Sequence, residues 1–159
     1  MDDLDRRLVD LFAAEPRIGV LGASRRLGVA RGTVQARLDR MEARGVVTGW
    51  GPELSPEALG YPVTAFLTLE ISQAGDRSTG GHTHAAAHLA RIPEVLEAHT
   101  ITGAGDLWCR VVARSNADLQ RVIDAVLDDP AVQRSTTVIA LERQVAYRVL
   151  PLARRPGAS

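Results

Sequence analysis

Cysteine is nearly absent from the 159-residue sequence, since Cys109 is the only one. A single thiol forms no internal disulfide, which excludes a secreted disulfide scaffold and a four-cysteine zinc cluster. The sequence also lacks an apolar run near the roughly 18 residues that span a bilayer. Residues 1–5 are acidic, whereas a signal peptide begins with basic residues. We therefore expect a cytoplasmic protein with no membrane segment.

Net charge is absent as well, because 19 arginines balance 19 acidic residues. This balance excludes a nucleic-acid binder that relies on overall basicity. The charges are unevenly placed, however: seven arginines and two acidic residues lie between Arg17 and Arg44, a local excess of five positive charges. A basic segment in a neutral protein is typical of a nucleic-acid-reading head attached to another domain.

The first 50 residues predict a helix–turn–helix domain with a wing. Apolar spacing and glycine stops predict helices over 4–14, 20–27 and 31–44, with a β-hairpin following at 46–51. In the third helix Val34, Leu38 and Met41 share one face, whereas Thr33 and Arg40 lie opposite among small residues that permit close approach to a DNA groove. The alternative is a purely structural helical subdomain with a solvated arginine face.

The second half predicts the order βαββαβ. Strands are expected at 63–71, 95–102, 107–113 and 132–141, with helices over 82–92 and after a cap at Asn116. A weak repeat places Pro93 and Pro130 at the same point before a strand. The pattern predicts an α+β, ferredoxin-like sheet with both helices on one face, and self-association would cover the other face. The expected domains are 1–50 and 63–150, joined by a linker at 51–62 and followed by an extended, frayed tail at 151–159.

A glycine-rich turn at 102–106 is a candidate ligand site. Its backbone N–H groups could bind a carboxylate, and Asp106 could bind an ammonium group, which together suit an amino acid. The alternative is a hairpin turn that merely uses glycine and aspartate.

Catalytic and metal motifs are weak. The histidines are His82, His84, His88 and His99, and the spacing of His84 and His88 resembles zinc sites without a completing ligand. Cys109 has no nucleophile motif around it, and the sequence contains no P-loop, Gly-x-Ser-x-Gly or Rossmann fingerprint. We expect no catalytic residues, no metal and no cofactor.

Several short motifs, in this order and spacing, resemble the Lrp/AsnC, or feast/famine, regulators over residues 3–152. They are Gly28-Val29-Ala30, Arg37, Met41-Glu42, Gly45-Val46-Val47, Leu59-Gly60, Thr102-Gly103-x-x-Asp106 and Ser135-x-Thr137. The resemblance implies a winged helix–turn–helix domain that binds double-stranded DNA. It also implies a ferredoxin-like domain that responds to an amino acid or a related small molecule, and dimers that pair through the sheet and assemble into octamers.

The resemblance also implies particular site residues. The DNA-facing set would be Arg31, Thr33, Gln35, Arg37 and Arg40, and the effector site between dimers would include Gly103, Gly105, Asp106 and Thr137. Ala30 departs from the family, which usually has a capping serine at that position. Two alternatives share the architecture: an effector-independent DNA-organising protein, and a siroheme decarboxylase-like enzyme that would use the clustered histidines.

Overall fold

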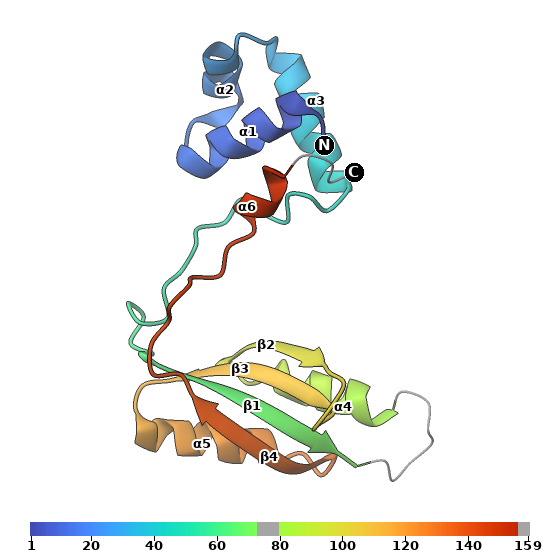
Figure 1. Cartoon of the computed structure of the whole chain (residues 1–159), viewed down its shortest axis with the longest axis vertical. Helices are drawn as coiled ribbons and strands as arrows, with labels where there is room; N and C mark the ends of the chain where they lie inside the picture. Colours follow the sequence, from blue (N-terminus) through green and yellow to red (C-terminus); the bar gives the residue numbers. More distant parts are fainter. Residues whose placement is uncertain (73–79, 156–159) are drawn as a thin grey trace. The chain divides into compact units, whose positions relative to one another are not determined.

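The chain forms two compact units. The computed structural model describes residues 1–72 and 80–155 (Figure 1). The first unit combines Met1–Pro52 with the segment from Val145 onward, and the second unit is Glu53–Gln144. Among the described residues, no helix has the length and apolar character needed to cross a membrane.

Three helices build the first unit: α1 (Asp3–Ala14), α2 (Gly19–Leu27) and α3 (Arg31–Ala43). Their bounds confirm the three helices expected from the sequence. Asp2 caps α1 and Asp5 returns the contact in a capping box, while Gly28 ends α2 in the left-handed region at φ 68°. The core of the unit consists of five buried side chains, Leu8, Ala23, Val34, Leu38 and Met41.

The prediction of a β-hairpin at 46–51 is wrong, because these residues form no strand. The backbone N–H of Val46 donates to the carbonyl of Met41, so this segment first closes the end of α3. Trp50 then turns back onto the helices. Its ring meets that of Phe12 edge-on with centroids 5.1 Å apart, and its indole N–H donates to Glu42 over 2.6 Å.

Over residues 151–155 the tail also differs from the expectation of an extended, frayed end; residues 156–159 of the expected tail lie outside the described residues. Leu150–Ala153 forms a short helix, α6, which packs against α1 within the first unit. Pro151 fits the first turn of a helix because its missing N–H has no partner there in any case. Arg154 Nε lies 2.7 Å from Asp10 Oδ1 and ties the end of this helix to α1.

The second unit has the expected βαββαβ order. Its elements are β1 (Val63–Ile71), α4 (Gly80–Leu89), β2 (Val95–Thr100), β3 (Leu107–Ala113), α5 (Asn116–Leu127) and β4 (Val132–Ile139). The strands pair antiparallel in the order β2-β3-β1-β4, and α4 and α5 cover one face of the sheet (Figure 1). Ser115 rather than Asn116 caps α5, because its hydroxyl accepts from the N–H of Asp118.

The two faces of the sheet differ sharply. Alternate side chains of β1 and β3, such as Leu67 and Cys109, are fully buried under the helices. On the other face the rings of Phe66 and Trp108 stack with centroids 5.3 Å apart, and Val138 beside Phe66 is 60% exposed. The apolar side chains of this face lie beside Arg110, which pairs in register with Phe66 and forms an ion pair with Glu97. The face has no covering layer within the described part of the unit.

Arg121 on α5 contacts two carboxylates. Asp118 is on the same helix, whereas Glu94 directly precedes β2, so the contact with Glu94 joins the two elements. Arg121 Nη2 lies 2.6 Å from Glu94 Oε1, and its Nε lies 2.8 Å from Asp118 Oδ1. These contacts with Arg121 are the main reason that the pKa values of Glu94 and Asp118 are lowered. Carboxylates with lowered folded pKa values stabilise the fold above their unfolded pKa values, near 4, and lose this contribution as the pH falls through the folded values.

We therefore expect Arg121→Gln to lower the melting temperature by a few degrees at pH 7. The difference from wild type should shrink as the pH is lowered from about 5 to 3, because protonation removes the partners of Arg121. Thermal melts across this pH range check the prediction. Arg91→Gln is the matched control, since Arg91 is exposed and has no ion pair with any described residue. A difference that does not change with pH would contradict this role of Arg121.

Candidate functional sites

The exposed side of α3 is the candidate nucleic-acid interface. Val34, Leu38 and Met41 face the core. The first turns expose Arg31, Thr33 and Gln35. Arg31 and Thr33 have no side-chain partner among the described residues, whereas Gln35 donates to Asp39 over 2.7 Å. The small residues Gly32 and Ala36 are exposed between them, so a partner could approach the helix backbone closely.

The beginning of α3 lacks a side-chain cap. Ala30 occupies the N-cap position with extended backbone angles, and its methyl group accepts no hydrogen bond. Serine or aspartate there would satisfy one N–H of the first turn, and its absence costs about 1 kcal/mol. The first-turn N–H groups beside Arg31 therefore keep a capacity to donate outward, which an anion such as a DNA phosphate could use.

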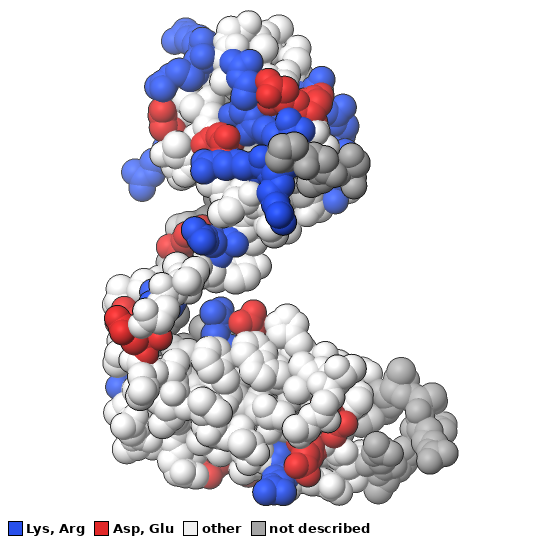
Figure 2. Space-filling view, viewed as in Figure 1, with Lys and Arg blue, Asp and Glu red and all other residues white. Residues whose placement is uncertain are grey.

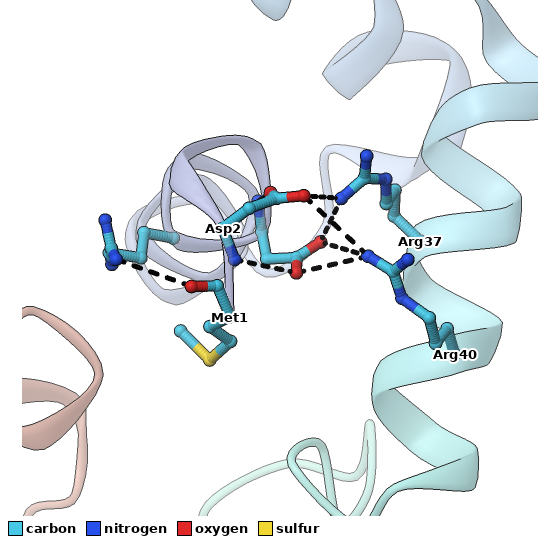
Figure 3. A network of polar contacts seen from close by, with 6 residues as sticks. Met1, Asp2, Arg37 and Arg40 are labelled. Atoms are coloured by element: carbon cyan, nitrogen blue, oxygen red, sulfur yellow. Dashed lines mark hydrogen bonds and ion pairs between the residues drawn. The ribbon is translucent and has the colours of Figure 1, made fainter. Parts of the chain in front are cut away.

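Arg37 and Arg40, by contrast, are engaged within the protein. Figure 3 shows both guanidinium groups directed at the start of α1, where Asp2 lies. Both also form ion pairs with Asp5. Arg37 Nη1 forms an ion pair with Asp2 and lies 3.1 Å from Asp5 Oδ1. Arg40 Nη2 lies 3.2 Å from each oxygen of Asp5. Asp5 is buried, with 2% of its surface exposed.

The start of α1 holds Asp2 in its charged form. A hydrogen bond from the backbone N–H of Asp5, followed by the contact with Arg37, lowers the pKa of Asp2 to about 2. Sequence reasoning missed Asp2 and Asp5 as partners of α3, because it considered only acidic residues near the arginines in sequence. The visible signal was the Asp2-x-x-Asp5 pattern of a capping box, which locates the helix start but not its partner.

Charge is distributed unequally between the two units. Figure 2 shows arginines gathered over the first unit, whereas the visible face of the second unit is largely uncharged. The segment from Val145 onward adds Arg148, Arg154 and Arg155 to the first unit without any acidic residue. The first unit therefore has the electrostatic character that favours an anionic partner.

The turn at 102–106 packs closely on the end of β1. Gly103 has a φ of 114°, a conformation that side chains rarely adopt. A Cβ on Gly105 would lie 2.4 Å from the methyl carbon of Thr68, so only glycine fits there. Asp106 fixes the turn, because its N–H donates to Leu69 and its Oδ2 accepts from the N–H of Ile71 over 2.7 Å.

The side chain of Thr137 is not on the face of the sheet that this turn contacts. Thr137 pairs with Leu67, whose side chain is buried under the helices, whereas Thr68 beside Gly105 pairs with Thr136. Because successive residues of a strand point to opposite faces, Thr136 is on the side of Gly105 and Thr137 on the other. The structure thus brings Gly103, Gly105 and Asp106 together but does not bring the side chain of Thr137 to them.

The remaining reactive side chains have structural surroundings. His84 Nε2 and His88 Nδ1 lie 3.4 and 3.9 Å from Asp129 Oδ2, and the other nitrogen of His88 contacts the carbonyl of Ala125. In the described ranges, no three His, Cys, Asp or Glu residues are grouped so that they could hold a metal ion. Burial raises the pKa of the Cys109 thiol to about 11, which keeps it protonated and a poor nucleophile.

Comparisons with known proteins cover almost the whole chain. Residues 64–150 match the Lrp/AsnC ligand binding domain, and residues 1–42 match the AsnC-type helix-turn-helix domain. The regulatory protein AsnC of Escherichia coli is 29% identical over 152 residues, which are 95% of this chain and 97% of that protein.

Solved structures agree. The structure of E. coli AsnC matches with a TM-score of 0.83 at 28% identity, covering 95% of this chain and 99% of that one. A feast or famine regulatory protein from M. tuberculosis, complexed with L-methionine, matches with a TM-score of 0.78 at 30% identity over 93% and 97% of the two chains. The order of a helical head and a four-stranded sheet domain is therefore shared with proteins of known fold.

Proposed function

Since the chain belongs to the Lrp/AsnC family of transcriptional regulators, we propose that it binds double-stranded DNA through α3 and responds to an amino acid or a related small molecule. The effector would alter either the assembly of the protein or its affinity for DNA. The proposal includes a cytoplasmic location and no catalytic activity.

The exposed face of α3 is the single observation that carries the DNA-binding part. It combines the guanidinium of Arg31, which has no partner in the described part of the chain, the exposed side chains of Thr33 and Gln35, and small residues that allow close approach. An arginine of this kind can bind a phosphate or the O6 and N7 atoms of guanine, and threonine and glutamine can contact base edges. The family resemblance also implies Arg37 and Arg40 as DNA-facing residues. Arg40 is half-exposed and stays in the proposed set, whereas Arg37 is ion-paired with both Asp2 and Asp5, which makes it a less accessible donor for DNA.

The turn at 102–106 is the proposed effector site, with Gly103, Gly105 and Asp106 as its residues. Thr137 belongs to the proposed set only because the family resemblance implies it, since its side chain is on the other face of β4 from Gly105. The L-methionine bound to the M. tuberculosis relative supports an amino acid as the class of ligand. In this chain the support is local: Gly103 is exposed, so a carboxylate can approach its backbone, and among the described residues Asp106 uses only one oxygen, for Ile71. The second oxygen of Asp106 could accept from an ammonium group.

Self-association through the open sheet face completes the proposal. Phe66, Trp108 and the exposed Val138 provide an apolar group beside Arg110 that a second copy would cover. A homodimer formed in this way would present two α3 helices, and further assembly into octamers would increase the number of DNA contacts made together. An effector that changes assembly would then change DNA binding as well.

A thermal-shift screen of the full chain against the amino acids tests the effector site. A ligand at ten times its dissociation constant should stabilise the protein by roughly 1.4 kcal/mol, which is visible as a higher melting temperature. Asp106→Asn should remove that shift, because the amide keeps an oxygen for Ile71 but loses the charge that attracts an ammonium group. Asp128→Asn, on an exposed residue at the end of α5, should respond like wild type.

Two results would contradict the effector assignment. One is an Asp106→Asn variant that shifts as much as wild type, which would place the ligand elsewhere. The other is that none of the amino acids changes the melting temperature or the oligomer distribution of the wild-type protein. That result would favour the effector-independent DNA-organising protein. An absorbance scan of the purified protein separates the decarboxylase-like alternative, since a bound tetrapyrrole absorbs visible light.

A further inference from the structure

We propose that Arg37 is a positioning residue that acts through Asp5, and that it does not contact DNA. This inference rests on the proposed DNA binding of α3. Arg37 is on the recognition helix, but its side chain is only 26% exposed and its Nη1 is shared between Asp2 and Asp5 (Figure 3). A phosphate could reach this donor only by displacing two carboxylates.

Asp5 gives the reason for this arrangement. Its side chain is 3% exposed, and a buried carboxylate is stable only when cations and hydrogen-bond donors surround it. Its donors are Arg37 and Arg40 from α3 and the backbone N–H of Asp2, 3.2 Å from Oδ2. Removing Arg37 would leave Asp5 with one half-exposed arginine and a single N–H as its nearby donors.

The position of Arg37 on α3 makes the contact mechanically useful. Val34, Leu38 and Met41 bury one stripe of the helix, which sets its depth in the unit. Non-directional apolar contacts define rotation about the helix axis weakly, whereas hydrogen-bonded ion pairs have a fixed geometry. The pairs from Arg37 and Arg40 to the start of α1 therefore fix how α3 presents its outer face.

This assignment divides the arginines of α3 by role. Arg31 has no ionic partner in the described structure and is free to contact DNA. Arg40 is 48% exposed and can contact Asp5 with one nitrogen while its other donors face solvent. Arg37 is the anchor. Asp2 and Asp5, which carry the wrong sign to contact DNA, become part of the DNA-binding machinery because they set the placement of the helix.

A double-mutant cycle distinguishes an anchor from a DNA contact. Arg37→Met removes the charge but keeps an unbranched side chain, and Asp5→Asn removes the buried charge but keeps an acceptor for the N–H of Asp2. The single Arg37→Met change should lower the melting temperature and weaken operator binding by about tenfold or more, because Asp5 is left buried and poorly paired. Adding Asp5→Asn should restore both properties to within roughly threefold of wild type, although position 37 still has no cation.

The salt dependence of binding provides an independent readout. The slope of log affinity against log salt falls by about 0.9 for each lost phosphate contact. For an anchor, the slope of Arg37→Met should equal that of wild type. Arg44→Met is the control for loss of charge directly after the same helix, since Arg44 is its C-cap residue, is exposed and has no ion pair among the described residues. It should leave the melting temperature unchanged.

The inference is overturned if the double variant binds as weakly as Arg37→Met with a slope reduced by about 0.9, which would make Arg37 a phosphate ligand. It is also overturned if Arg37→Met melts and binds like wild type. A failure of the proposed DNA-binding function gives a distinguishable result, because the wild-type protein itself would then bind no operator. In that case the melting temperatures of the cycle would still show whether Arg37 anchors α3.

Discussion

Arg31→Ala is expected to weaken operator binding by about 5- to 150-fold, because losing one good base contact costs roughly 1–3 kcal/mol. The side chain is exposed at the first position of α3 and has no ionic partner in the described residues, so the variant should fold and melt like wild type. Fluorescence anisotropy with a labelled fragment of the protein's own promoter region, measured at several salt concentrations, gives both the affinity and the salt slope.

The matched control for this prediction is Arg7→Ala. Arg7 is an exposed arginine on α1 of the same unit, and its removal changes the net charge by the same amount. General electrostatic attraction would make the two variants equally weak, whereas a contact from α3 predicts a larger loss for Arg31→Ala. Equal binding by Arg31→Ala and wild type would show that the beginning of α3 does not contact DNA.

Val138→Glu is expected to convert the proposed dimer into monomers. Val138 is 60% exposed on the open sheet face and pairs in register with Phe66, at the centre of the surface proposed for self-association. Each dimer would bury two unpaired carboxylates, and a buried unpaired charge costs about 3–5 kcal/mol. Because Val138 is exposed within the single chain, the fold of the monomer should persist. Light scattering with circular dichroism separates the loss of assembly from unfolding.

Thr83→Glu controls for the added charge. Thr83 is exposed on α4, on the side of the unit away from the open sheet face, so this variant should remain a dimer. A Val138→Glu protein with the same mass in solution as wild type would mean that the open face is not the interface. The loss of assembly should also weaken operator binding, because two linked α3 helices bind DNA more tightly than one.

Local sequence patterns predicted most of the fold. The spacing of Leu4, Leu8 and Leu11 gives a helix wherever the rest of the unit supplies an apolar partner, and α1 was expected within one residue of its observed start. The alternating apolar residues of β1 likewise fixed its bounds, Val63–Ile71. These features depend on residues close together in the sequence.

The features that sequence reasoning missed depend on distant residues. Trp50 packs on Phe12 and bonds to Glu42, which removes the hairpin expected at 46–51. Arg154 meets Asp10 across 144 positions, which supports a helix where a frayed tail was expected. The anchor from Asp5 to Arg37 joins residues 32 positions apart, and no local pattern reports such a partner.

The candidate site residues also divide into those that local sequence identifies and those whose placement depends on distant parts of the chain. Gly103, Gly105 and Asp106 were recognisable because a turn requires particular residues in sequence. The placement of Thr137 depends on the register of β4 against β1, which includes a shift beside Ile71. A change of register by one residue exchanges the faces of a strand, so the sequence could not decide between Thr136 and Thr137.

A sequence-specific regulator that responds to an effector must bind its own promoter fragment more tightly than a scrambled fragment of the same length. We would measure the affinity of the wild-type protein for both fragments, first without any amino acid and then with each amino acid in turn. We expect tighter binding to the promoter fragment, a steep loss of affinity with salt, and at least one amino acid that changes the promoter affinity several-fold. Equal affinity for both fragments, unchanged by every amino acid, would contradict a sequence-specific regulator that responds to an effector.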